Sequence, residues 1–170
     1  DKIGYKINSL FDNQGVSLQD SIKNFSKKIK VAKEASFSGD FLVIARIESL
    51  ILGKSINDAL KRAESYCAAG VDGIMIHSKS TKPDEIFKFT KIFKNKKYAK
   101  PLISVPSTYS KTYEKELRLN GFQIIIYANH QIRASYKSMM NTAQTILKNQ
   151  RAFETEKSIS KINEVLTLIK

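Results

Sequence analysis

The chain has 170 residues, enough for one domain with a hydrophobic core, and 42% hydrophobic and 26% charged residues are ordinary values for a globular protein. No apolar run approaches the roughly 18 residues that a membrane-spanning helix needs, so no membrane association is predicted. The net charge of +13 excludes an acidic protein. Cys67 is the only cysteine, so no internal disulfide can form, and this favours a reducing, cytoplasmic location.

Short apolar runs alternate along the chain with segments of helical periodicity. Gly70 and Gly121 stand where helices commonly end, and Pro83 suits the first turn of a helix. The patterns predict strands over residues 41–45, 71–76, 102–105 and 122–127 and helices over residues 56–69, 85–93, 111–119 and 131–149, with a last helix that Thr155 or Ser158 caps and that ends at Leu168.

This alternation predicts an α/β fold of about four βα units with parallel strands. Near-continuous apolar strands indicate a parallel sheet that is covered on both faces. A doubly wound sheet and a (βα)₈ barrel of the TIM type both fit, but no glycine-rich phosphate loop follows any predicted strand. Four units are half of such a barrel, and the sequence begins at Asp1 without a methionine. We therefore expect residues 1–170 to form a single domain that is the C-terminal half of a barrel, with its N-terminal strands upstream of Asp1.

Polar side chains follow each predicted strand. In barrels and in open parallel sheets the ligand lies at the carboxyl ends of the strands. Arg46 ends a strand that should be buried, and a buried guanidinium needs a partner, which a phosphoryl or carboxylate ligand could supply. The residues at these ends predict a site for a small anion: Arg46, Glu48, His77, Ser78, Lys79, Ser107, Thr108, Tyr109, Asn129, His130 and Arg133.

Each of these residues also has a structural interpretation. Arg46 could pair with Glu48, which would then orient it, and His77 could be a core histidine bonded to a carbonyl. Asn129 could cap the helix that follows it, and Lys79 could be solvated. Cys67 has no neighbouring histidine and is interpreted as a small core residue. With two histidines and one cysteine in the chain, a zinc site is not expected.

The positive charge leaves nucleic-acid binding as an alternative. A basic face could hold a phosphate backbone. Only five of the 29 basic residues are arginine, however, and no aromatic ladder interleaves the lysines, which decorate amphipathic segments. We therefore expect a small-molecule substrate and no nucleic acid.

The sequence resembles the phosphoenolpyruvate mutase family of the isocitrate lyase superfamily. Residues 1–10 are similar to the segment of that family in which Lys-x-Asn-Ser-Leu follows Glu-Asp-Lys. The likeness covers essentially the whole chain in order, and its other motifs are Ala45-Arg46-Ile47-Glu48, Asp58-Ala59-Leu60-Lys61-Arg62-Ala63, Asp72-Gly73-Ile74-Met75-Ile76-His77-Ser78-Lys79, Pro101 to Pro106 with Tyr109, and Tyr127-Ala128-Asn129-His130-Gln131-Ile132-Arg133-Ala134.

The resemblance implies a (βα)₈ barrel that interconverts phosphoenolpyruvate and 3-phosphonopyruvate with Mg²⁺, as a homodimer or homotetramer. It implies that Asn8, Arg46 and His77 hold the moving phosphoryl group. Ser9 and Leu10 would bind substrate from a loop that closes over it, and Lys6 would position that loop and add positive charge.

The resemblance also implies what the chain does not carry. The acidic metal ligands and the catalytic aspartate of the family would lie before Asp1, so no metal ligand is expected in residues 1–170 and the chain alone should be inactive. A phosphonopyruvate hydrolase on the same scaffold remains an alternative. A C–C lyase is a weaker one, because the segment from Lys6 to Ser9 lacks the thiol of the lyase branch.

Overall fold

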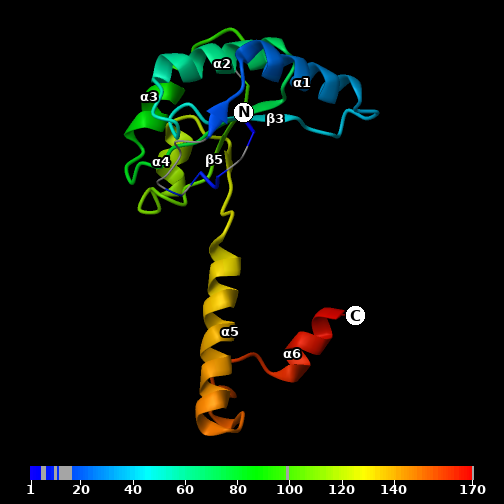
Figure 1. The fold of residues 1–170 in the computed structure, drawn as a ribbon, viewed down its shortest axis with the longest axis vertical. Coiled ribbons are helices and arrows are strands. Elements are labelled where there is room, and N and C mark those ends of the chain that lie inside the picture. Colours follow the sequence, from blue (N-terminus) through cyan, green and yellow to red (C-terminus); the bar gives the residue numbers. More distant parts are fainter. Residues whose placement is uncertain (5–6, 10, 12–16, 99, 170) are drawn as a thin grey trace. The chain divides into compact units, whose positions relative to one another are not determined.

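A computed structural model describes residues 1–4, 7–9, 11, 17–98 and 100–169. The chain divides into two compact units, Asp1–Ala128 and Asn129–Lys170. The first unit contains β1 (Lys2–Ile3), β2 (Leu18–Gln19), α1 (Ile22–Glu34), β3 (Ile44–Ile47), α2 (Ile56–Ala68), β4 (Gly73–Ile76), α3 (Asp84–Phe93), β5 (Leu102–Ser104), α4 (Glu114–Leu119) and β6 (Ile124–Ile125) (Figure 1).

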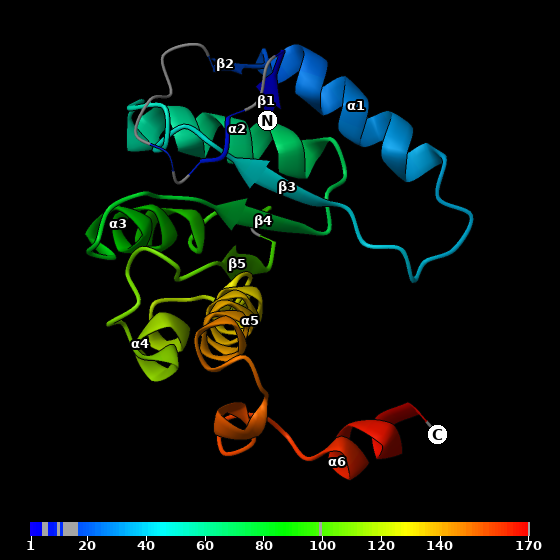
Figure 2. The same ribbon diagram turned by 60° about the horizontal axis from the view of Figure 1, so that its bottom comes forward.

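The principal sheet of the first unit is parallel, as predicted. Its strand order is β3-β4-β5-β6, and each strand pairs with the next along the chain. Figure 2 shows β3, β4 and β5 side by side with their arrows in one direction. The strands β1 and β2 form a separate antiparallel pair. A helix follows each of β3, β4 and β5, so the predicted βα repeat is confirmed.

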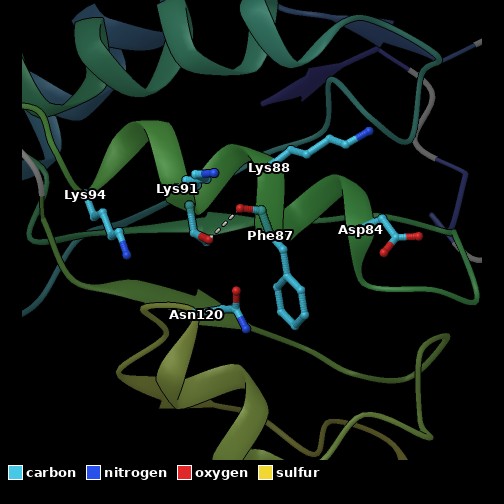
Figure 3. A pocket seen from close by; sticks show the side chains of 7 residues that line it. Asp84, Phe87, Lys88, Lys91, Lys94 and Asn120 are labelled. Atoms are coloured by element: carbon cyan, nitrogen blue, oxygen red, sulfur yellow. Dashed lines mark hydrogen bonds between the residues drawn. The ribbon is translucent and has the colours of Figure 1, made fainter.

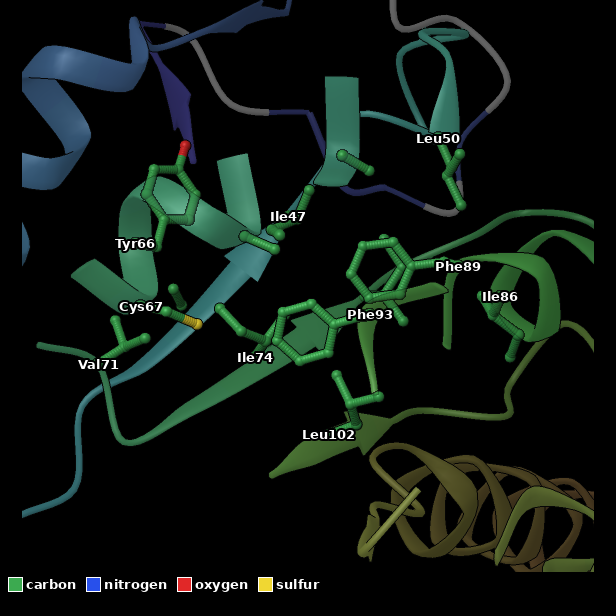
Figure 4. Close-up of a cluster of buried hydrophobic side chains, with 14 of the residues drawn as sticks. Ile47, Leu50, Tyr66, Cys67, Val71, Ile74, Ile86, Phe89, Phe93 and Leu102 are labelled. Atoms are coloured by element: carbon green, nitrogen blue, oxygen red, sulfur yellow. The ribbon is translucent and has the colours of Figure 1, made fainter. Parts of the chain in front are cut away.

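The core lies on the face of the sheet that α2 and α3 cover. Alternate strand residues such as Ile47, Ile74 and Leu102 point into it and meet Tyr66 of α2 and Phe89 of α3 (Figure 4). Because side chains alternate across a strand, the residues between them lie on the other face.

That other face is only partly covered within the part of the chain that the structure describes. Ile44 is 37% exposed and Ile124 is 42% exposed, whereas Ile103 of β5 is 1% exposed. The prediction of a sheet covered on both faces is therefore wrong for the outer strands β3 and β6 among the described residues. In a closed barrel this face would be the interior.

The first helix, α1, was not among the predicted elements. Ser21 caps it by accepting the Asn24 N–H at 3.1 Å, and the helix lies beside α2 in both views (Figures 1 and 2). Only Ile29 is buried along its length, so its apolar face is narrow.

The predicted boundaries of β3 are wrong. The strand was expected over residues 41–45, but it begins three residues later and ends two residues later. The carboxylate of Asp72 accepts the Val43 N–H at 2.7 Å, while the Asp72 N–H donates to the Val43 carbonyl at 2.9 Å. These two bonds join the residue before β3 to the residue before β4, and Arg46 lies within β3 rather than after it.

Two predicted helix starts are also wrong. The helix expected from Lys111 begins at Glu114, because the Thr112 N–H bonds back to the Tyr109 carbonyl at 3.0 Å and forms a turn. The expected cap residues of the last helix instead donate their hydroxyls to the turn before it: Thr155 to the Ala152 carbonyl at 2.6 Å and Ser158 to the Thr155 carbonyl at 2.9 Å.

The second unit is mostly helical and consists of α5 (His130–Asn149), a 3₁₀ turn η1 (Phe153–Thr155), α6 (Ile162–Leu166) and a 3₁₀ turn η2 (Thr167–Ile169). Gln150 ends α5 in a left-handed conformation with φ of 54°. Every residue of α5 is at least partly exposed. None of the helices within the described ranges is long and apolar enough to cross a membrane.

Gly73 lies in a tightly packed place between neighbouring strands, so its substitution tests this packing. A Cβ at this position would lie 2.9 Å from the Cδ1 atoms of both Ile44 and Ile103 and 3.2 Å from the Pro101 carbonyl oxygen. Overpacking of this kind costs about 1–3 kcal/mol, so Gly73→Ala should lower the free energy of unfolding in urea by that order. Gly39→Ala is the control, because its Cβ would meet nothing within 4 Å. Equal stability of the two variants would contradict the packing described here.

Cys67 is buried in the core beside Val71 and Ile74, as its sequence context predicted (Figure 4). Burial raises the pKa of its thiol to about 11. The thiolate is the reactive species, so at pH 8 only about one thiol in a thousand is ionised. Labelling of Cys67 by iodoacetamide, followed by mass spectrometry, should be slow in the folded protein and fast in guanidinium. Equal rates in both states would mean that the thiol is not in the core.

Candidate active site

The carboxyl ends of β3 and β4 bring together two of the predicted site residues. Ile47 pairs with Ile76 in the parallel register, so Glu48 and His77 follow at the same level. Arg46 and Glu48 alternate with Ile47, which lies in the core, and therefore occupy the other face. Sequence analysis correctly placed Arg46, Glu48 and His77 at one end of the sheet.

Glu48 is the central group of this cluster. Its residue is only 1% exposed. The Arg46 Nε–H donates to its Oε1, the Ser9 hydroxyl donates to its Oε2 at 2.7 Å, and the Lys2 ammonium lies 3.5 Å from Oε2. The alternative in which Arg46 pairs with Glu48 is thus what the structure shows. Arg46 was expected to be buried, but 48% of its side chain is exposed.

Ser9 connects the same groups from a different segment. Its hydroxyl oxygen accepts a hydrogen bond from Arg46 Nη2 at 2.9 Å and one from Lys2 Nζ at 3.4 Å, while its O–H donates a hydrogen bond to Glu48. A hydroxyl has one donor and two acceptor sites, so these contacts use all of its capacity. Lys2 also donates to the Ile7 carbonyl at 3.2 Å. We define Lys2, Ser9, Arg46 and Glu48 as the Glu48 cluster.

The Glu48 cluster carries a net positive charge, because two cationic side chains surround one carboxylate. Burial opposes ionisation of Glu48, but the Ser9 hydrogen bond and the charges of Arg46, His77 and Lys2 outweigh it and lower the pKa of the carboxyl. Glu48 is therefore ionised at neutral pH, and one positive charge remains for an anion.

His77 stands next to the cluster as a neutral group. Burial lowers the pKa of its imidazole and the charges of Arg46 and Lys2 act in the same direction, although the Glu48 carboxylate opposes them. The residue is 7% exposed, and its Nδ1 atom has no hydrogen-bond partner among the described residues. A neutral ring with an unused nitrogen is suited to a directed hydrogen bond with a ligand.

A second layer supports the cluster through Asp1. The Asp1 carboxylate accepts hydrogen bonds from the Tyr66 hydroxyl at 2.7 Å, from Arg62 Nη1 at 3.3 Å and from the Glu48 N–H at 3.0 Å. All four residues are buried. Sequence reasoning missed this network, and the only signal was an arginine on an amphipathic helix without an assigned partner.

Several predicted site residues have other positions or roles. Lys6 and Leu10 lie outside the described residues. Asn8 is described, and its carbonyl accepts the Phe11 N–H at 3.0 Å. The Ser78 hydroxyl donates to Glu85 of α3 at 2.7 Å, and its carbonyl accepts from Thr108 at 3.2 Å, so both side chains hold loops together. Lys79 is exposed.

Tyr109 belongs to the core rather than to the strand-end cluster. It is fully buried, and this burial raises the pKa of its hydroxyl to about 12. Asn129, His130 and Arg133 belong to the second unit, at the start of α5. Within that unit, His130, Arg133, Tyr136 and Met139 line an apolar pocket of about 730 Å³.

A pocket of about 440 Å³ lies on α3, away from the strand ends. Lys88 and Lys91 of α3 line it together with Lys94, which directly follows α3, and Asn120, which directly follows α4 (Figure 3). Its lysines stand on an exposed helix surface and share no residue with the Glu48 cluster. The pocket is therefore separate from the candidate active site.

No group of three His, Cys, Asp or Glu side chains that could hold a metal ion occurs in the described part of the chain. The two buried carboxylates nearest the strand ends, Asp1 and Glu48, are both occupied by protein donors. The described residues thus bring hydrogen-bond donors and cationic groups to the strand ends, without a cluster of three potential metal ligands.

Comparison with known proteins agrees with this geometry. The family model for phosphoenolpyruvate phosphomutase matches residues 3–147. The phosphoenolpyruvate phosphomutase of Tetrahymena pyriformis is 39% identical over 99% of this chain and 55% of the relative. The phosphonopyruvate hydrolase of Variovorax sp. (strain Pal2) is 35% identical over 86% of this chain and 50% of the relative.

Solved structures give the same result. The phosphoenolpyruvate phosphomutase of Streptomyces platensis subsp. rosaceus superimposes with a TM-score of 0.88 at 37% identity, covering 96% of this chain and 55% of that one. A phosphonopyruvate hydrolase in complex with oxalate and Mg²⁺ gives a TM-score of 0.81 at 35% identity, covering 88% of this chain and 52% of that one.

The chain spans about half the length of the curated relatives it matches. Its parallel sheet with helices corresponds to part of the barrel fold of those structures, which confirms the predicted fold class. The resemblance seen in the sequence motifs is confirmed by the family match. By sequence and by structure, the chain belongs to the phosphoenolpyruvate phosphomutase family.

Proposed function

We propose that the protein containing this chain interconverts phosphoenolpyruvate and 3-phosphonopyruvate. The observation that carries the proposal is the net positive Glu48 cluster beside a neutral His77, in a chain that relatives named phosphoenolpyruvate phosphomutase match over nearly its whole length. The described residues provide positioning and charge, and phosphoryl transfer needs little else from a protein.

Arg46 is proposed to hold the moving phosphoryl group. A guanidinium has five N–H donors. Nε donates to Glu48 and one Nη2 proton to Ser9, and among the described residues the other three have no acceptor. Half of the side chain is exposed, so these donors are accessible to phosphoryl oxygens. His77 and Asn8 are proposed to add directed hydrogen bonds, and Lys6, Ser9 and Leu10 to complete the substrate contacts from the same segment.

A phosphonopyruvate hydrolase is the second candidate, because one relative at 35% identity carries that name. The same anion-holding groups would serve both reactions, which differ in whether water or the pyruvate portion takes the phosphoryl group. A C–C lyase is disfavoured, because Cys67, the one thiol of the chain, is buried in α2 with its pKa raised by burial.

The proposal includes Mg²⁺, a cytoplasmic location and a homodimer or homotetramer. One related hydrolase was crystallised with oxalate and Mg²⁺. The metal ligands are proposed to lie outside the described residues, as the resemblance to the phosphoenolpyruvate mutase family implies.

The reaction can be followed directly by phosphorus NMR. With Mg²⁺ and 3-phosphonopyruvate, the full-length protein should produce the signal of phosphoenolpyruvate. Inorganic phosphate in its place would identify the hydrolase. The isolated 170-residue chain should produce neither signal, since the metal ligands are proposed to lie outside it; turnover by that chain would refute this placement.

Arg46→Ala in the full-length protein tests the anion-holding role. Removal of a preorganised charge-stabilising donor typically lowers kcat by about 10²–10³-fold, and a loss of that size is expected here. Arg118→Ala is the matched control, because Arg118 is exposed on α4. Unchanged turnover of Arg46→Ala, with circular dichroism confirming the fold, would remove Arg46 from the site.

A further inference from the structure

We propose that Glu48 is the positioning residue of this site: one buried carboxylate fixes the guanidinium of Arg46 and, through Ser9, ties it to the segment that carries Asn8. The inference rests on the proposed function and names residues that act through Arg46 rather than on the substrate. Lys2 completes the arrangement by balancing the charge of Glu48.

Arg46 loses conformational freedom when it is held by Glu48 and Ser9. A long, half-exposed arginine side chain has many rotamers, and holding it in one of them costs conformational entropy. The Nε–H bond to Glu48 and the Nη2 bond to Ser9 act on two different nitrogens of the same plane. Two contacts on a rigid planar group define its orientation, so the remaining N–H donors point in a fixed direction.

Ser9 links the Glu48 cluster to the segment that carries Asn8. Its donor and both of its acceptor sites are used within the Glu48 cluster, and the residue is buried. Ser9 directly follows Asn8, so a bond that fixes Ser9 also restricts the main chain of Asn8. Arg46 of β3 and Asn8 after β1 are both proposed to touch the phosphoryl moiety. The Glu48 carboxylate therefore fixes the positions of both.

Lys2 determines the net charge of the Glu48 cluster. Arg46 and Glu48 alone would be a neutral pair, which attracts a phosphoryl anion weakly. Lys2 lies 3.5 Å from Glu48 Oε2, with its side chain buried, and restores a net positive charge. The structure thus separates two tasks: Lys2 balances the buried carboxylate, and the charge of Arg46 remains available to the ligand.

Glu48 is not suited to act as a general acid or base itself. Both of its oxygens accept hydrogen bonds from protein groups, and the residue is almost completely buried. A proton-transfer group must reach the substrate within hydrogen-bond distance. Positioning is the role that remains for an ionised carboxylate in this place.

The test is a double-mutant cycle in the full-length protein, with turnover of 3-phosphonopyruvate as the readout. Glu48→Gln keeps the volume of the side chain but removes its charge, and kcat should fall by roughly 10²-fold, the usual effect of a small misplacement at a reacting group. In the Arg46→Ala background the same change should cost less than about threefold, because residues that act as a unit are not additive. Ser9→Ala should lose roughly tenfold, and Ser9→Thr, which keeps the hydroxyl, should recover most of it.

Asp72→Asn is the matched control. Asp72 is an ion-paired carboxylate at the opposite end of the same strands, where it bonds Lys33 at 2.8 Å and the Val43 N–H at 2.7 Å. Its substitution should lower the melting temperature without lowering kcat. If Glu48→Gln lowers kcat by the same factor with and without Arg46, Glu48 does not act through Arg46 and the inference is overturned.

The cycle also separates this inference from the proposed function. If the wild-type protein forms neither phosphoenolpyruvate nor phosphate, the proposed function is wrong, and the cycle is then measured on the dissociation constant for oxalate with Mg²⁺ by calorimetry. Non-additive losses of oxalate affinity would support the positioning role, and additive losses would overturn it. A wild-type protein that neither reacts nor binds oxalate would contradict both.

Discussion

A buried carboxylate must be paired, and the pairing of Glu48 organises this end of the molecule. An unpaired ion in the interior costs several kcal/mol, so its donors have to be held in place. Two of them, Lys2 of β1 and Ser9, lie at least 39 residues before Glu48 in the sequence, and the third, Arg46 of β3, lies two residues before it. The Glu48 N–H in turn bonds Asp1, whose carboxylate also receives Tyr66 and Arg62 of α2. The electrostatic requirement of one residue thus connects the sheet, the helix layer and the segment before β2.

The alternation of the strands separates stability from chemistry. In β3, Ala45 and Ile47 face the core while Arg46 and Glu48 face the other way. In β4, Ile74 and Ile76 also face the core, and His77 directly follows them in the chain. The two sets thus occupy opposite faces of the same strands, and the network of Asp1 and Tyr66 connects them. Such a division fits a scaffold on which relatives named phosphomutase and hydrolase both occur.

Sequence patterns predicted those features that depend on periodicity and on strand order. The parallel βα repeat follows from apolar runs, and the meeting of Arg46, Glu48 and His77 follows from the rule that strand ends meet at one edge. The start of β3 was not predictable, because it depends on the contact of Asp72 with Val43 across the chain. Asp1, Lys2 and Tyr66 were missed as site-supporting residues for the same reason: their roles depend on long-range hydrogen bonds that no local pattern records.

The proposed role of Arg46 suits both candidate reactions. If Arg46 holds the phosphoryl group as proposed, Glu48 and Ser9 orient it in the same way whether the acceptor is the pyruvate portion or water. Relatives of both kinds align with this chain at 39% and 35% identity, which is consistent with a shared anion-holding part. We infer that the choice of acceptor depends on how completely water is excluded around the bound phosphoryl group, since exclusion of water is the general means by which such sites prevent hydrolysis. The Glu48 cluster would then hold the phosphoryl group. The exclusion of water around that group would determine whether water or the pyruvate portion accepts it.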